Sequence, residues 1–403
     1  MSSFNDSTAG IRLLPSSQLD EQCYHSVLIC VVRGLAALQV AAAHLRGAFF
    51  PDLSGIDNPT FWHHALTFAT GFAHLAVVMF FLISGWLVGG GLLNKLDAPD
   101  ALKLYAIDRL TRLWTVLLPT LLLIVAFGIL SGTLEPRSAD FSQARPYSVT
   151  SFAGNLLGLQ TVIVPPFGDN VALWSLANGT WYYVMFPLMV MTMTPKHRWP
   201  ATGALALCCA LLPLELVLYF CIWLLGAAFS RVRVHCGVLM RALLLGVTLA
   251  LCLHLRMTTE DNDLTIASFP QDVLISIIFL LFLSSTAFKP ARPLGWLASL
   301  RRWATLLSNF SFTLYVVHVP AIGMAAWLGT RLLGTDKIAA DRLAGLGAYL
   351  LLLAALVLFS YGFYLLFEAR TFALRRWARD LLLTPAGVPM AAPLAEKKHA
   401  TLS

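Results

Sequence analysis

The chain contains the stretch VLICVVRGLAALQVAAAH at residues 27–44, an apolar segment that carries Arg33 and ends in His44. A transmembrane helix needs about 20 mostly apolar residues, and this stretch approaches that length. A charged side chain near the centre of such a helix costs at least about 2.5–3.5 kcal/mol, so it usually faces protein or water. The stretch therefore predicts a transmembrane helix with one polar face, although Arg33 also lies near enough to one end to reach the membrane surface.

Composition extends this prediction to the whole chain. The 403 residues are 58% hydrophobic and 12% charged, whereas soluble globular proteins are about 25% charged. The mean hydropathy is +0.73. We therefore predict an all-α integral membrane protein, a bundle of about ten transmembrane helices. The predicted spans are 27–43, 72–93, 114–130, 181–193, 201–212, 215–230, 240–255, 272–287, 310–332 and 346–366.

The positions of lysine and arginine predict the orientation of the bundle. With the N-terminus in the cytoplasm, most of the 28 basic residues fall on the cytoplasmic side, which is the bias that membrane proteins show. Both termini are then cytoplasmic. We expect a polar N-terminal segment at 1–25, a transmembrane domain at 26–370 and a basic, disordered tail at 371–403. The connection at 131–180 lies on the outer side and is long enough to cover or build a site.

The net charge of +7 does not indicate a nucleic-acid-binding protein, because the basic residues lie between apolar runs and not on a soluble domain. The seven cysteines lack the spacing of zinc ligands. We therefore expect no nucleic-acid partner, no metal and no tightly bound cofactor.

Arg33 and His44 share one face of the first predicted helix. They are eleven residues apart, which leaves their side chains within about 20° of each other around the axis and roughly 16 Å apart along it. A histidine can be neutral near pH 7 and accept a proton from a hydroxyl group. A single histidine at a membrane surface is more often structural, and the aligned arginine shifts the interpretation towards function.

Five blocks of sequence strengthen the functional interpretation. They are RGLAALQVAAAH (33–44), FFLISGW (80–86), RLTR (109–112), LWSLAN with WYYVMFP (173–178 and 181–187), and SFTLYVVHVP (311–320). In this order they resemble the motifs of the acyltransferase-3 family of membrane proteins. The resemblance implies transfer of an acyl group, usually acetyl from acetyl-CoA, to a hydroxyl of a carbohydrate or similar acceptor. Acyl-CoA would be a co-substrate, a carbohydrate or lipid-linked glycan the acceptor, and membrane lipids the surroundings, in a bacterial inner or plasma membrane.

The resemblance gives the two aligned residues roles, with His44 as general base and Arg33 as a second catalytic residue. Arg109 and Arg112 are candidates for binding the donor, because residues three apart share a helix face and guanidinium groups bind phosphate. Ordinary anchoring at the cytoplasmic surface explains these two arginines equally well. Two further donor-binding candidates are Tyr315 and His318, for which a structural hydrogen bond is the alternative. The candidates for binding the acceptor or the oxyanion are Ser84, Trp174, Ser175, Asn178 and Tyr182.

One position departs from the family pattern. Gly179 stands where the family usually has an acidic residue, and Asp52 or Asp169 are possible substitutes. Two alternatives therefore remain, a family member without catalytic activity and a membrane transporter. The chain shows no inverted repeat of the kind found in many transporters. Lipopolysaccharide O-antigen, exopolysaccharide, a periplasmic glucan and a glycosylated small molecule all fit as acceptors.

Overall fold

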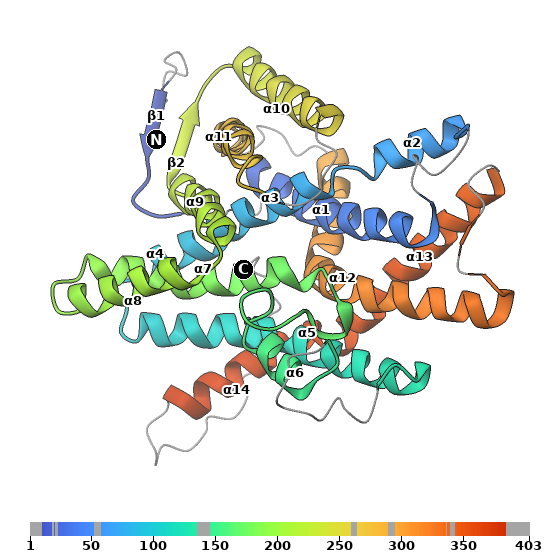
Figure 1. The fold of residues 1–403 in the computed structure, drawn as a ribbon. Helices are drawn as coiled ribbons and strands as arrows, with labels where there is room; N and C mark the ends of the chain where they lie inside the picture. The colour runs from blue at the N-terminus through green and yellow to red at the C-terminus, as the bar shows by residue number, and fades with distance from the viewer. Residues whose placement is uncertain are drawn as a thin grey trace.

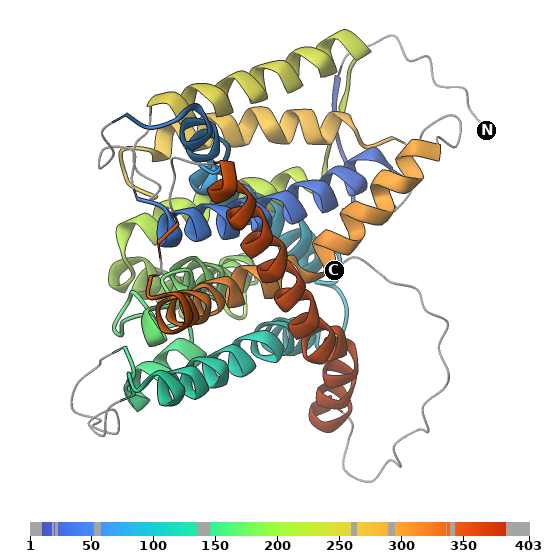
Figure 2. The ribbon, with the colours of Figure 1, turned by 90° about the vertical axis from the view of Figure 1, so that its right-hand side faces the viewer.

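The computed structural model describes residues 10–17, 20, 23–51, 58–134, 146–258, 264–288, 295–335, 337–338 and 343–383. Within these ranges nearly all regular structure is helical, and most long helices run side by side (Figures 1 and 2). The elements in chain order are β1 (Gly10–Leu13), α1 (Tyr24–Phe49), α2 (Phe61–Ala69), α3 (Ala73–Ser84), the π-helix η2 (Gly85–Gly89), α4 (Gly90–Leu93), α5 (Ala101–Ser131), α6 (Val149–Leu156), the 3₁₀-helix η4 (Phe167–Asp169), α7 (Leu173–Thr192), α8 (Arg198–Leu211), α9 (Leu214–Phe229), β2 (Val232–His235), α10 (Val238–Thr258), α11 (Phe269–Ser285), α12 (Gly295–Leu333), α13 (Leu343–Leu366), the 3₁₀-helix η5 (Glu368–Arg370) and α14 (Thr371–Leu383).

The helical, multi-pass character predicted from the sequence is confirmed. In the described part of the chain, six helical stretches are long and apolar enough to cross a membrane: Tyr24–Phe49, Phe61–Leu93, Ala101–Ser131, Val238–Thr258, Leu297–Leu333 and Leu343–Leu383. Two shorter apolar helices, Leu214–Phe229 and Phe269–Ser285, accompany them. Each of the ten predicted spans overlaps a helix. The number ten and the cytoplasmic placement of the termini stay predictions.

The first helix lies at the centre of the bundle, between α3 and α12. The glycine that follows Arg33 permits this packing, because a Cβ atom on Gly34 would lie 2.7 Å from the Cβ atom of Leu307 in α12. Figure 1 shows that α12 changes direction along its length, and its later part runs beside α1. The close approach at Gly34 therefore fixes the interface between the helices that carry the first and last sequence blocks.

A second close contact joins α3 and η2 to α9. A Cβ atom on Gly85 would lie 1.9 Å from the backbone oxygen of Trp223, and one on Gly226 would lie 2.0 Å from the backbone oxygen of Leu82. The two glycines thus let two backbones meet without side chains between them. The π-helix begins at Gly85, directly after Ser84, and such single-turn π-helices are frequent at functional sites.

The described part of the long connection packs onto the bundle through buried amides. Asn155 donates to the carbonyl of Pro165 at 2.9 Å, Gln160 donates to the carbonyl of Leu173 at 2.9 Å, and Asn170 donates to the carbonyl of Val316 in α12 at 3.0 Å. These bonds fix the segment before α7 and position the start of that helix.

The first and the last described elements, β1 and α14, each pack against another part of the protein. Strand β1 pairs antiparallel with β2, so the N-terminal segment and the α9–α10 connection lie on the same side of the bundle, as the predicted orientation requires. The first part of the predicted tail forms α14, which packs against α5, where Arg375 and Arg379 pair with Asp108 at 3.5 and 2.5 Å. The rest of the predicted tail, 384–403, lies outside the described residues.

Candidate active site

A cavity of ≈ 1010 Å³, partly open to solvent, lies between α1, α3, α5, α7 and α12. It brings together residues from all five sequence blocks. The predicted site residues that line it are Arg33, Ser84, Arg109, Arg112, Ser175 and Tyr315. Apolar side chains such as Val77, Phe80 and Leu113 form much of the remaining wall.

Three arginines give this cavity a positive charge, and none of the described residues that line it carries a carboxylate. Among the described residues, neither Arg33 nor Arg109 makes an ion pair. The guanidinium of Arg109 lies 5.9 Å from the centroid of the Tyr183 ring. Unpaired guanidinium groups around a partly enclosed space are suited to bind carboxylate or phosphate anions.

Arg112 differs from the other two arginines because it is paired. Its guanidinium lies 2.6 Å from Oε1 of Glu368, a residue that is only 3% exposed. The other carboxylate oxygen of Glu368 accepts from the backbone N–H of Thr313 at 3.1 Å and from the Thr313 hydroxyl. Arg112 therefore ties α5 to η5 and α12 as well as lining the cavity. No sequence pattern predicts this pairing, because it depends on contacts between segments far apart in the chain.

His44 forms a hydrogen-bonded pair with His318 across α1 and α12. Nδ1 of His44 lies 2.7 Å from Nε2 of His318, and the two rings stack with centroids 4.9 Å apart. His318 is fully buried, and its Nδ1 lies 2.7 Å from the carbonyl oxygen of Tyr315. A carbonyl can only accept, so Nδ1 of His318 carries a proton and, in the neutral ring, Nε2 accepts from Nδ1–H of His44. Nε2 of His44 then has a free lone pair and can accept a proton.

Tyr315 connects the histidine pair to the cavity. Its side chain lines the cavity, its ring centroid is 5.8 Å from that of His318, and its hydroxyl is 2.5 Å from Oγ of Ser175. His44 and His318 are not among the lining residues. The histidine pair therefore lies behind Tyr315, outside the cavity lining. His318, a predicted donor-binding residue, contacts His44 and does not lie among the arginines of the cavity.

A comparison with known protein families agrees with this arrangement. The model of an acyltransferase domain that defines the acyltransferase-3 family matches residues 29–370. The chain belongs to the acyltransferase-3 family. No curated protein and no solved structure matches the chain. The match confirms the resemblance inferred from the five blocks, and the protein is a multi-pass membrane acyltransferase by family.

Ser84 lies on the cavity wall where α3 passes into the π-helix. Its Oγ accepts from the indole N–H of Trp223 at 3.1 Å and lies 3.3 Å from the hydroxyl of Tyr183. The family block FFLISGW thus combines a cavity hydroxyl at Ser84 with the close helix contact at Gly85.

The family block on α7 divides between two sides of the helix. Ser175 and Gly179 line the first cavity, whereas Trp174 and Asn178 line a second one. Tyr182 lines neither cavity. It is buried, and its hydroxyl donates to the carbonyl of Leu216 at 3.1 Å.

The suggested substitutes for the missing family acid do not reach the first cavity. Asp169 is exposed and lines neither cavity. Asp52 lies outside the described residues. Gly179 itself has open space around it, because a Cβ atom there would meet nothing within 4 Å.

Proposed function

We propose that the protein moves an acyl group, by default acetyl, from cytoplasmic acyl-CoA to a hydroxyl of a cell-surface or exported carbohydrate in a bacterial inner or plasma membrane. One observation carries the proposal. Tyr315 lines a cavity that also holds two arginines without an ion pair among the described residues, and its ring lies against a histidine pair in which Nε2 of His44 can accept a proton. Family membership supports acyl transfer.

The chemistry of the cavity fits an acyl-CoA donor. CoA carries phosphates on a long pantetheine arm that ends in a thioester. Arg109 and Arg112, near the predicted cytoplasmic end of α5, would bind the phosphates, and the apolar wall would hold the arm. Arg33, which makes no ion pair among the described residues, would contact the arm or a phosphate from α1.

The transfer needs one base and no covalent enzyme intermediate. Nε2 of His44 takes the proton of the acceptor hydroxyl while the hydroxyl oxygen attacks the thioester carbonyl carbon. A tetrahedral oxyanion forms. When this intermediate collapses, the new C–O bond remains and the C–S bond breaks. The CoA sulfur leaves with the proton that His44 accepted, so the products are the acyl ester and free CoA.

The candidates for stabilising the oxyanion differ in their distance from the histidine pair. Ser175 and Tyr315 share a hydrogen bond at the cavity wall beside His318. One hydroxyl donates to the other, so one O–H of the pair is left to donate to the oxyanion. Hydroxyl donors held in place before the reaction stabilise charge that develops in the transition state. We therefore favour this pair for the oxyanion over Tyr182, whose hydroxyl is bonded to a backbone carbonyl.

Removal of the base tests the proposal. Surface glycans from cells that express the wild type should carry acyl groups detectable by mass spectrometry, and His44→Ala should abolish them. His64→Ala is a matched control, because His64 is exposed and lies on α2. Equal acylation by the wild type and His44→Ala would exclude the mechanism.

Gly179 motivates the alternative of a family member that binds its ligands without turnover. Because open space surrounds Gly179 in the first cavity, Gly179→Glu can restore the usual acid without a clash. A large gain in acyl transfer would show that the natural chain is impaired by the missing carboxylate. Unchanged or lower activity would show that catalysis does not depend on an acid at this position.

A further inference from the structure

The second cavity, of ≈ 660 Å³, lies on the other side of α7 from the arginines. Trp174 and Asn178 are four residues apart and so share one helix face. Glu215, in the first turn of α9, and Thr161, from the segment before α7, line the same cavity. The long connection thus contributes to a site together with two helices.

Polar groups without partners face this cavity. Asn178 is 7% exposed, and its side-chain amide makes no hydrogen bond to any described residue. Glu215 likewise forms no ion pair or side-chain hydrogen bond within the described ranges. The Asn178 amide is buried, and a buried polar group needs a hydrogen-bond partner. An amide and a carboxylate at one cavity, both without a partner among the described residues, indicate that a ligand or water completes their bonding.

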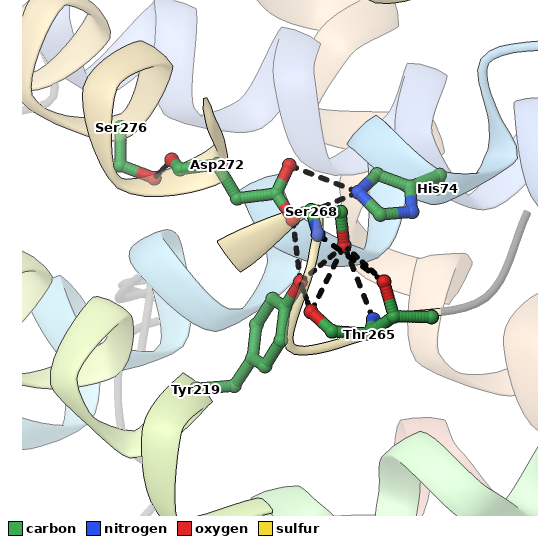
Figure 3. Close-up of polar contacts among 6 residues, drawn as sticks. All are labelled: His74, Tyr219, Thr265, Ser268, Asp272 and Ser276. Atoms are coloured by element: carbon green, nitrogen blue, oxygen red, sulfur yellow. Dashed lines mark hydrogen bonds and ion pairs between the residues drawn. The ribbon is translucent and has the colours of Figure 1, made fainter. Parts of the chain in front are cut away.

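The Tyr219 side of the second cavity is held in place by a network of buried hydrogen bonds. The Tyr219 hydroxyl donates to Oδ2 of Asp272 at 2.5 Å and lies 3.0 Å from Oγ of Ser268. Nε2 of His74 lies 2.9 Å from both carboxylate oxygens of Asp272. Figure 3 shows Asp272 between the histidine and the tyrosine.

This network joins three helices at the cavity. His74 belongs to α3, Tyr219 to α9 and Asp272 to α11. Asp272 is 1% exposed, and a buried carboxylate is tolerated only when it is paired and hydrogen-bonded. The paired carboxylate therefore fixes the Tyr219 ring as a rigid wall of the site.

The combination of groups matches the chemistry of a sugar ring. Sugar hydroxyls donate to a carboxylate and accept from an amide N–H, and the C–H face of the ring packs against an aromatic side chain. Sites of this kind combine an aromatic or apolar wall with a few placed polar groups. Glu215 supplies the carboxylate, Asn178 the amide and Trp174 the aromatic ring.

We propose that the second cavity is a subsite for one sugar unit of the acceptor, with Glu215 and Asn178 bonding its hydroxyls and Trp174 packing on its face. The subsite adjoins the reaction centre through α7, because Trp174 precedes Ser175, whose hydroxyl bonds Tyr315 beside His318. This inference rests on the proposed function, because it names the cavity in which the carbohydrate acceptor of that reaction binds.

Kinetics of the full-length protein in detergent test the subsite. The probe is surface glycan extracted from cells that lack the protein, with acetyl-CoA as donor. Glu215→Gln and Trp174→Ala should each raise the KM for this glycan at least tenfold, whereas the KM for acetyl-CoA stays within twofold. Trp199→Ala is the matched control, because Trp199 is 80% exposed on α8 and lines neither cavity.

The possible results separate the two proposals. An unchanged KM for the glycan in both variants would overturn the subsite while leaving the proposed function intact. Equal increases in both KM values would also overturn it, because a folding defect and not a lost contact would explain them. Absence of transfer by the wild type would overturn the proposed function, and the subsite with it.

Discussion

The hydrogen bond between His44 and His318 determines which nitrogen of His44 can act as a base. His318 presents an acceptor to Nδ1–H of His44 because its own Nδ1 donates to a backbone carbonyl. We therefore propose His318 as a positioning residue for His44, comparable to a carboxylate that orients a catalytic histidine.

Substitution of His318 should lower turnover without weakening donor binding. His318→Leu removes the acceptor, and we expect kcat to fall on the order of 10²-fold, the lower range for loss of an effective general base. The KM for acyl-CoA should change little, since His318 does not line the first cavity. His318→Gln places an amide oxygen near the position of Nε2 and should recover part of kcat. An effect confined to KM would contradict the positioning role.

Arg109 and Arg112 lie three residues apart but should respond differently to substitution. Arg109 makes no ion pair in the described part of the chain, so Arg109→Gln should raise the KM for acyl-CoA with little effect on stability. Arg112→Gln leaves the buried Glu368 carboxylate without its partner. Breaking a buried pair costs about 3–5 kcal/mol, and we expect the lower end, about 3 kcal/mol, because the Arg112 side chain is 25% exposed.

The measurements are steady-state kinetics and thermal unfolding of the purified variants. The double variant Arg112→Gln with Glu368→Gln is the control, because it removes both charges and should regain part of the stability. Equal stability of Arg109→Gln and Arg112→Gln would show that the Arg112–Glu368 pair contributes nothing to the stability of the fold.

Sequence reasoning predicted some of these residues and not their contacts. The spacing of eleven residues placed Arg33 and His44 on one face, because the geometry of a single helix is regular. The partner of His44 lies 274 positions away, and the partner of Arg112 lies beyond α13. Such pairs depend on how helices pack, and helical periodicity carries no information about which helix faces which.

At the scale of elements, the glycines of the FFLISGW block and of α9 set the distance between two helices. Gly85 and Gly226 each face a backbone carbonyl of the opposite helix. A methyl group at either position would push the backbones apart, and Ser84 would move with them because it accepts from the indole of Trp223 on α9.

A pair of alanine substitutions isolates this contact. Gly85→Ala should destabilise the protein by about 1–3 kcal/mol or more, the usual cost of overpacking, and should lower kcat by displacing Ser84. Gly91→Ala is the matched control, since a Cβ atom at Gly91 would meet nothing within 4 Å. Thermal unfolding of both variants gives the comparison, and equal melting temperatures would show that the interface has room for a methyl group.

The sequence block on α7 shows why motif order predicts a site better than it predicts individual roles. Neighbouring residues of one helix point about 100° apart, so Trp174 and Ser175 line different cavities. The motif indicates the helix that carries these candidate residues. Which side each residue faces depends on the contacts of α7 with α3, with α9 and with the segment before it. The periodicity of the sequence does not predict those contacts.

At the scale of the whole molecule, the outer helices bury little of their surface. In Val238–Thr258 only 11% of the most apolar window is buried, against 78% in Phe61–Leu93. Exposed leucines on α10 and α13, such as Leu249, Leu351 and Leu358, are unsuited to water but suited to lipid. The composition predicted this arrangement, because 58% hydrophobic residues exceed what an interior can hold.

The orientation of the bundle gives the last prediction. Pairing of β1 with β2 puts β1 beside the α9–α10 connection. Helix α7 runs from the second cavity, at Trp174, to the connection before α8. If the positive-inside bias holds, single cysteines in place of Gly10 and Lys196 should react only with a reagent that reaches the cytoplasm. A cysteine at Thr133, after α5, should react with an impermeant reagent added outside. The background must first have its seven cysteines changed to serine. Reaction of positions 10 and 133 from the same side would contradict the predicted orientation. If that side is the cytoplasm, the start of α5 with Arg109 and Arg112 would lie outside, away from cytoplasmic acyl-CoA.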